Sequence, residues 1–158
     1  TMIKLKTIEP LRGLHRYSAW KAGWADKDSI DVFSYISNEC SPEDFLLCCK
    51  LLFPDFVIVD GAVLLEHKYE VGTFNSWVSQ LDGDLCAIEK VVNHTHMYDV
   101  FEGCSDDVDE AVFTQLAEVI CLSWRLLLRD KFPDKNFCVD VLNSDQEYGP
   151  VVTFYQVL

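Results

Sequence analysis

The sequence predicts an α+β protein in which an antiparallel sheet of about four or five strands, built from hairpins, carries helices mainly on one face. Three observations lead to this prediction. Strand-like runs occur in pairs around turn residues, helical patterns lie between these pairs, and capping residues mark the helix starts. The chain has 158 residues, of which 49% are apolar, so we expect residues 1–158 to form a single globular domain with its own core.

The first fifty residues give the weakest signals. Residues 2–8 alternate weakly between apolar and polar side chains, which predicts an edge strand before Pro10. The aromatic-rich segment that follows is expected to be irregular or to form a short helix ending near Gly23. In residues 29–38, apolar side chains recur every three positions, and this spacing favours a helix.

A helix over residues 41–53 is the clearest predicted element. Ser41 is suited to the N-cap, and Pro42 takes the first helical position, where a missing N–H costs nothing. The side chains from Phe45 to Phe53 are apolar on almost every side, and Pro54 ends the helix. A helix without a polar face is typical of a protein interior, so we expect this one to be buried in the middle of the domain.

The remaining elements alternate between hairpins and helices. The segment "FVIVDGAVLL" predicts a hairpin, because Asp60-Gly61 suits a two-residue turn. Short helices are expected over "TFNSWVSQL", capped by Thr73, and after a cap at Asp82 or Asp84. A long amphipathic helix is predicted over residues 107–131, followed by strands over 137–142 and 150–157. The apolar stripe expected to face the core of the long helix consists of Val108, Val112, Leu116, Val119, Ser123 and Leu126.

Charge is distributed unequally along the chain. The 13 basic and 26 acidic residues give a net charge of −13. Residues 1–30, a basic and aromatic-rich N-terminal segment, hold six basic and three acidic residues, a net charge of +3, so residues 31–158 carry −16. This field repels nucleic acid and anionic membranes and speeds the encounter with a basic partner. We therefore expect a basic protein partner, no nucleic acid and no membrane.

The location expected from the sequence is the cytoplasm. No run approaches the roughly 18 apolar residues of a membrane span, and the first residues do not have the pattern of a signal peptide. The seven cysteines are an odd number without the spacing of a zinc site, which is typical of free thiols in a reducing compartment. We predict no metal and no cofactor.

The stretch "NHTHMYDVF" holds the candidate catalytic residues His94, His96 and Asp99, to which His15 is added as a more distant candidate. In a helix, the two histidines would point roughly 200° apart and could not share a metal ion. In an extended segment they would lie on the same side and could bind one. Asp99, His15 and His67 are the candidates for a third ligand. The spacing of Leu85, Ile88 and Val92 favours a helix up to the histidines.

The segment "RGLHRYSAWKAGW" interleaves basic and aromatic side chains, and its candidate ligand-binding residues are Arg12, Arg16, Trp20 and Trp24. Such side chains can clamp phosphates or stack on bases. Because the rest of the chain is strongly acidic, we favour an internal role, in which the basic segment lies across the acidic body and the tryptophans anchor it. A small anionic ligand between the two parts is the alternative.

The run "EGCSDDVDE" is the candidate surface for a basic partner, and it lacks the ligand pattern of a calcium loop. The chain also lacks the phosphate-binding glycine motifs, the nucleophile elbow and the HExxH motif of common enzyme classes. We therefore predict an acidic interaction module that is not an enzyme, with a metal-dependent or acid–base enzyme centred on His94, His96 and Asp99 as the alternative. The residues predicted to bind the partner are Asp106, Asp107, Asp109, Glu110, Asp145 and Glu147.

The stretches "RYSAWKAGW", "SPEDFLLCCKLLFPDFVIVDGAVLL", "FNSWVSQLDGD", "VVNHTHMYDVF" and "YGPVVTFY" resemble a group of bacterial single-domain proteins over nearly the whole chain. No activity is implied by that resemblance. In its size, acidity and cysteine content the chain is also similar in type to the immunity proteins of bacterial toxin systems. This second resemblance implies a partner that is a basic toxin domain.

Overall fold

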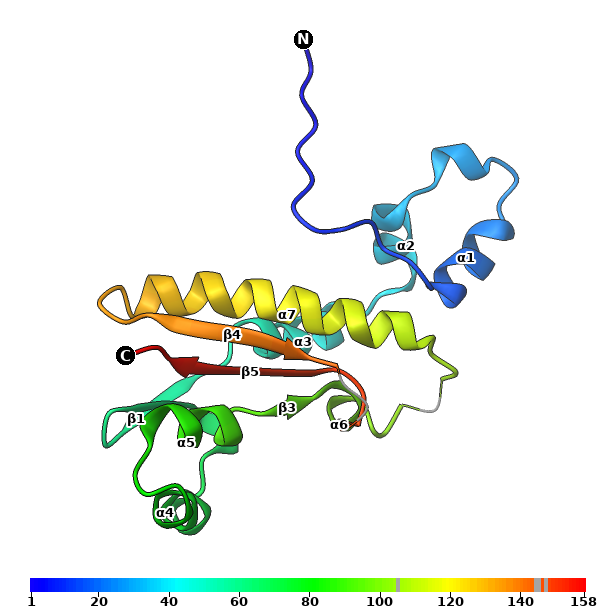
Figure 1. Ribbon diagram of the computed structural model, residues 1–158. Coiled ribbons are helices and arrows are strands. Elements are labelled where there is room, and N and C mark those ends of the chain that lie inside the picture. The colour runs from blue at the N-terminus through cyan, green and yellow to red at the C-terminus, as the bar shows by residue number, and fades with distance from the viewer. Residues whose placement is uncertain (105, 144–145, 147) are drawn as a thin grey trace.

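A computed structural model describes residues 1–104, 106–143, 146 and 148–158. The described part is an α+β protein with two small antiparallel sheets and helices around them (Figure 1). The helices are α1 (His15–Ala22), α2 (Val32–Glu39), α3 (Pro42–Leu52), α4 (Val71–Gln80), α5 (Leu85–Val92), α6 (Met97–Val100) and α7 (Glu110–Lys131), with short 3-10 turns η1 (Lys27–Ser29) and η2 (Glu66–Lys68). The strands are β1 (Phe56–Val59), β2 (Ala62–Leu65), β3 (Thr95–His96), β4 (Phe137–Leu142) and β5 (Val151–Gln156).

The two hairpin predictions are confirmed. β1 and β2 pair in antiparallel register around Asp60 and Gly61, whose φ angles of 50° and 87° are both positive, as a type I′ turn requires. β4 and β5 pair over their full length, from Phe137 opposite Gln156 to Leu142 opposite Val151. The sequence pattern therefore locates both hairpins correctly.

The prediction of one sheet with four or five strands is wrong, because the strands form a two-stranded and a three-stranded sheet. The second sheet has the order β3-β5-β4, and its short strand β3 was not predicted. Thr95 pairs with Val152, and His96 with Val151. Beyond this short pairing, the same edge of β5 is bonded to side chains of α5.

Two buried polar side chains, Glu89 of α5 and Asn93 at the C-cap of this helix, lie between the sheets and replace direct strand pairing. The Asn93 side-chain amide accepts a hydrogen bond from the Leu65 amide and donates to the carbonyls of Val63 and Phe154. The Glu89 carboxylate accepts from the amides of Val63 and Gln156. β2 and β5 thus satisfy their backbone groups through one helix, so the hairpin and the sheet stay separate.

The core lies on both faces of β2, whose side chains alternate. Val63 and Leu65 pack with α7, β4 and β5 in the main cluster, whereas Ala62 and Leu64 pack with Phe74 of α4 and with α5. In Figure 1, α7 runs along the three-stranded sheet, and α4 and α5 lie on the far side of the hairpin. The helices therefore cover two faces, and the prediction that they pack mainly on one face is wrong.

α7 ends at Lys131 as predicted, but it begins at Glu110 instead of residue 107, and it buries a different stripe. Asp109 caps its first turn by accepting from the Ala111 amide. The predicted stripe included Leu126, which is 58% exposed, because the sheet covers the neighbouring face of the helix. By length and composition α7 could cross a membrane, and in the structure one of its faces packs against the sheet. The buried residues are Gln115, Ala117, Ile120, Cys121, Trp124 and Leu128.

α3 has the predicted bounds and the predicted Ser41 cap, but it is not buried. Phe45, Leu46 and Leu47 are 67%, 71% and 64% exposed. Only the end of the helix joins the body, where the carbonyls of Leu51 and Leu52 accept hydrogen bonds from the Trp124 indole and the Ser123 hydroxyl. The apolar composition of α3 therefore produces an exposed apolar surface in place of a central core helix.

The N-terminal third contributes almost nothing to the core. Residues 2–8 form no strand, which contradicts the prediction of an edge strand. The aromatic-rich segment forms the short helix ending near Gly23, one of its two predicted alternatives, as α1, and the helix favoured over residues 29–38 is observed as α2. Together α1 and α2 extend away from the body beyond the start of α7 (Figure 1). We call residues 15–39 the α1–α2 lobe. Ile30 is the one residue among the first 53 that is buried.

Of the caps predicted for the two short helices, the one for α5 is confirmed and the one for α4 is wrong. Asp84 caps α5 by accepting from the Ala87 amide, which confirms one of the two caps considered. α4 begins earlier than expected, because the Glu70 carboxylate accepts from the amides of Gly72 and Thr73. Thr73 therefore lies in the first turn of the helix and is not its cap. All seven cysteines are described, and each is a free thiol.

Candidate protein-binding site

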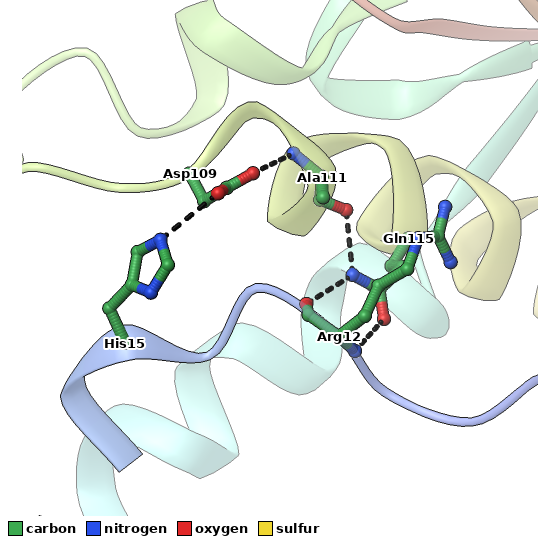
Figure 2. A network of polar contacts seen from close by, with 5 residues as sticks. All are labelled: Arg12, His15, Asp109, Ala111 and Gln115. Atoms are coloured by element: carbon green, nitrogen blue, oxygen red, sulfur yellow. Dashed lines mark hydrogen bonds and ion pairs between the residues drawn. The ribbon is translucent and has the colours of Figure 1, made fainter. Parts of the chain in front are cut away.

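The N-terminal segment is attached to the body through the backbone of Arg12. The Gln115 side chain, which is nearly buried on α7, accepts from the Arg12 amide at 2.8 Å and donates to the Arg12 carbonyl at 2.7 Å (Figure 2). Gly13 follows with a φ of 72°, and a Cβ at this position would lie 3.2 Å from Cγ of Asp109. A glycine is therefore needed where the chain turns past α7 into α1.

His15 is bound to the acidic cap of α7. Its Nε2 lies 3.0 Å from Oδ2 of Asp109, whose other oxygen accepts from the Ala111 amide at 2.8 Å (Figure 2). The Ala111 amide and, after it, the His15 ring hold the pKa of Asp109 below its ordinary value. His15 is therefore engaged in a structural contact. In the sequence it is also far from the other candidate catalytic residues.

Arg16 makes the second contact between the lobe and the acidic run. Its guanidinium lies 3.4 Å from Oδ2 of Asp106, and both side chains stay largely exposed. Asp107 is also exposed and lines the same cavity as this pair, whereas Glu110 is exposed and interacts with Tyr98. Of the other residues predicted to bind a partner, Asp145 and Glu147 lie outside the described residues.

The aromatic side chains of the lobe pack on one another. Trp20 lies 5.5 Å from Trp24 and 5.2 Å from Tyr35 between ring centroids, both in edge-to-face geometry. Tyr17 meets Tyr35 edge to face at 5.6 Å. The basic segment does lie against the acidic start of α7, as favoured from the sequence. The tryptophans, however, join α1 to α2, and the polar contacts of Arg12, His15 and Arg16 join the segment to the body.

A cavity of about 270 Å³ opens where the lobe meets the start of α7. Leu14, Tyr17, Val32, Tyr35, Val108 and Val112 form its apolar part. Three carboxylates, those of Asp106, Asp107 and Asp109, lie along the wall that α7 and the loop before it contribute. We call this concave site the junction cavity.

The two histidines of "NHTHMYDVF" lie against each other, which differs from the helix favoured by the spacing. α5 ends at Val92, and the extended segment that follows places the His94 and His96 rings edge to face with centroids 4.6 Å apart. The rings nevertheless line different cavities. His96 and Asp99 line one with His67 and Lys68, whereas His94 lines another beside Glu70 and Trp77.

Among the residues that the structure describes, no three His, Cys, Asp or Glu side chains lie close enough to bind a metal ion together. His67, a candidate third ligand in the sequence, lines the same cavity as His96 and Asp99. Lys68 follows it in η2 and lines the cavity too, which was not expected from the sequence. Both retain access to solvent, yet partial desolvation lowers the pKa of each. Their order in the sequence, Glu66-His67-Lys68, offers no signal of this arrangement.

Comparison of the chain with protein-family models, with curated proteins and with solved structures gave no match.

Proposed function

We propose that this protein is an interaction module that binds a basic protein partner at the junction cavity and is not an enzyme. The feature that supports the proposal is the combination of an apolar cavity with three carboxylates on one wall, in a chain of net charge −13. A lysine or arginine side chain of a partner fits this chemistry. Its aliphatic stem packs on apolar residues while its charged end reaches the carboxylates.

The cavity already contains the two side chains that such a partner would replace. Arg16 holds Asp106 at 3.4 Å, and His15 holds Asp109 at 3.0 Å. Because both basic side chains are exposed, these contacts are weak and can exchange for stronger ones at low cost. The rings of Tyr17 and Tyr35, which also line the cavity, offer cation–π contacts to an incoming guanidinium.

The surface of the N-terminal third supports a protein partner over a small ligand. Thirteen large apolar side chains between Met2 and Phe53 are exposed among the described residues, including Phe33 and Ile36 of α2 and Phe45 to Leu47 of α3. Exposed apolar side chains in such number are typical of surfaces that another molecule covers. A second copy of this chain would bring −13 against −13, so a basic protein is the better occupant.

The biological role that we propose is that of an immunity-type protein, which neutralises a basic toxin domain by covering it. The small size and acidity of the chain support this role, as does the absence of the common catalytic motifs from its sequence. An acid–base enzyme that uses His94, His96 and Asp99 is the alternative proposal. It has less support, because His94 lines a different cavity from the other two.

The proposal can be tested by titrating the protein with a peptide of alternating lysine and leucine. Binding is measured from the amide chemical shifts of the protein, and the titration is repeated at rising salt concentration. We expect shifts to concentrate on residues 13–17, 32–35 and 106–112, with affinity that falls steeply between low and physiological salt. Asp106→Asn removes one carboxylate of the cavity wall and should weaken binding about tenfold, the effect of losing one charge-assisted contact.

The matched control is Asp134→Asn, which removes an exposed carboxylate just past the opposite end of α7. This variant should bind the peptide almost as tightly as the native chain. If it loses as much affinity as Asp106→Asn, the attraction is a property of the total charge and the junction cavity is not the site. Shifts that spread evenly over the protein would contradict the proposal in the same way.

A further inference from the structure

A second cavity, of about 290 Å³, lies where the end of α3, η2, β3, α6 and α7 meet. It adjoins another hollow, with which it shares Lys50, Leu51, Pro54 and His67. This site is separate from the junction cavity and shares no lining residue with it. We call it the basic cavity.

The charge of the basic cavity is opposite to that of the protein. Lys50, Lys68, His67 and His96 line it, and Asp99 is its one carboxylate. Lys50 also lies 3.0 Å from Asp55, at the edge toward the adjoining hollow, where Glu66 contributes a second acid. The chain has twice as many acidic as basic residues. A concave site with an excess of basic groups is therefore unusual for this protein, and its local potential would attract an anion.

His96, which lines this cavity, holds an unsatisfied polar atom. Its Nδ1 is buried and has no hydrogen-bond partner among the described residues. The backbone of His96 is fixed by pairing with Val151, and its ring is held edge to face by His94. A buried imidazole nitrogen without a partner carries a desolvation cost, which a hydrogen-bonding ligand would remove.

The rest of the wall is apolar. Leu51, Pro54, Val100, Ile120 and Trp124 line the cavity, and the Trp124 indole N–H is already donated to the Leu51 carbonyl at 2.9 Å. Trp124 therefore offers a ring surface and no free donor. A ligand that fits both parts has an anionic head for the basic groups and an apolar body for this wall.

We propose that the basic cavity binds a small organic anion whose carboxylate or phosphate head meets Lys68, His67 and His96 and whose apolar body packs on Trp124 and Ile120. The head would receive charge-assisted hydrogen bonds, and Nδ1 of His96 would gain a partner. Asp99 opposes binding of an anion by its own charge. Partial desolvation lowers the pKa of His67 and of Lys68, which an anionic ligand would reverse.

The test uses phenyl phosphate, benzoate and inorganic phosphate as probes, and the indole N–H signals of the four tryptophans as reporters. We expect phenyl phosphate or benzoate to shift the Trp124 signal while the signals of Trp20 and Trp24, in the lobe, stay in place. The stronger of these two probes identifies the preferred head group. Inorganic phosphate should bind at least about tenfold more weakly, because it makes no contact with the apolar wall.

Three variants make the test specific. Lys68→Gln should lower the affinity for the tighter-binding probe about tenfold, the effect of losing one charge-assisted contact. Asp99→Asn should raise the affinity for the same probe, because the variant removes a carboxylate that repels the anion. Lys27→Gln, on the exposed turn η1, is the matched control and should leave affinity unchanged.

The proposal is overturned if benzyl alcohol, a neutral probe with the same ring, shifts Trp124 as effectively as the anions do. It is also overturned if Lys68→Gln and Lys27→Gln behave alike, or if inorganic phosphate binds as tightly as phenyl phosphate. A folded Asp99→Asn protein that binds the anions no better than the native chain would contradict the charge argument. This variant keeps the test decisive if Lys68→Gln does not fold.

Discussion

Asn93 and Glu89 are the residues that decide how the two sheets are joined. In "DLCAIEKVVNH" both fall on the polar side of an amphipathic helix, where solvent exposure is the usual outcome. The structure buries both completely and uses them to bond the edges of β2 and β5. The start of α5 was predictable, because Asp84 is a local cap; the sheet division was not, because it depends on partners 26 to 67 residues away.

Asn93→Ala should therefore be strongly destabilising. The substitution leaves the Leu65 amide and the Val63 and Phe154 carbonyls in the interior without their side-chain partner. We expect a loss of about 2–4 kcal/mol in the free energy of unfolding, measured by denaturant titration. Asn75→Ala, on the exposed surface of α4, is the control and should change stability by less than about 0.5 kcal/mol. Equal effects would mean that Asn93 does not bridge the sheets.

Asp109 gives a prediction for the dependence of stability on pH. Its pKa is lower in the folded chain than in the unfolded one, so its contribution is present above the ordinary value of 3.8 and is lost as pH falls through the folded pKa. Asp109→Asn keeps an oxygen that can accept from the Ala111 amide but cannot titrate. Thermal melts between pH 7 and pH 3 should show a smaller decline in the variant. An identical decline would show that folding does not lower the pKa of Asp109.

At the scale of elements, the bounds of helices were predictable and the faces that they bury were not. Ser41 and Pro42 mark the start of α3 through local hydrogen bonding and backbone geometry, so its position is correct. Its apolar composition predicted burial, but α7 receives only the last turn of α3. α7 is similar: it has apolar residues on several sides, and only contact with β4 and β5 selects the stripe that contains Trp124 and Leu128.

Two leucines of α7 test which stripe is buried. Leu128 is 1% exposed and Leu126 is 58% exposed, although the two residues lie only two positions apart in α7. Leu128→Ala should cost about 2–5 kcal/mol, because it removes core contacts and leaves a cavity. Leu126→Ala should change the free energy of unfolding by no more than about 0.5 kcal/mol. The reverse order, measured by urea unfolding of both variants, would restore the stripe predicted from the sequence.

At the scale of the whole molecule, the sequence indicated which charged segments meet, but not the contacts between them. The basic segment was expected to lie across the acidic body, and His15–Asp109 and Arg16–Asp106 join them. Opposite charges indicate such a contact without giving its geometry. The basic cavity was hidden from the sequence, because Lys50, Lys68 and His96 come from three separate segments and meet only after folding.

The division between a well-packed body and a sparsely packed N-terminal third predicts unequal stability within one chain. The α1–α2 lobe buries only Ile30, whereas α7 and β5 hold most of the main core. Local opening costs little where few apolar side chains are buried, so lobe amides should exchange with solvent at least about tenfold faster than those of α7 and β5. Hydrogen exchange followed residue by residue measures this directly.

Bound lysine–leucine peptide should slow exchange in the lobe, because it covers exposed apolar side chains and replaces the contacts of His15 and Arg16. Uniform protection along the free chain would show that the lobe is held by more than the junction contacts, and the proposed docking surface would lose its physical basis.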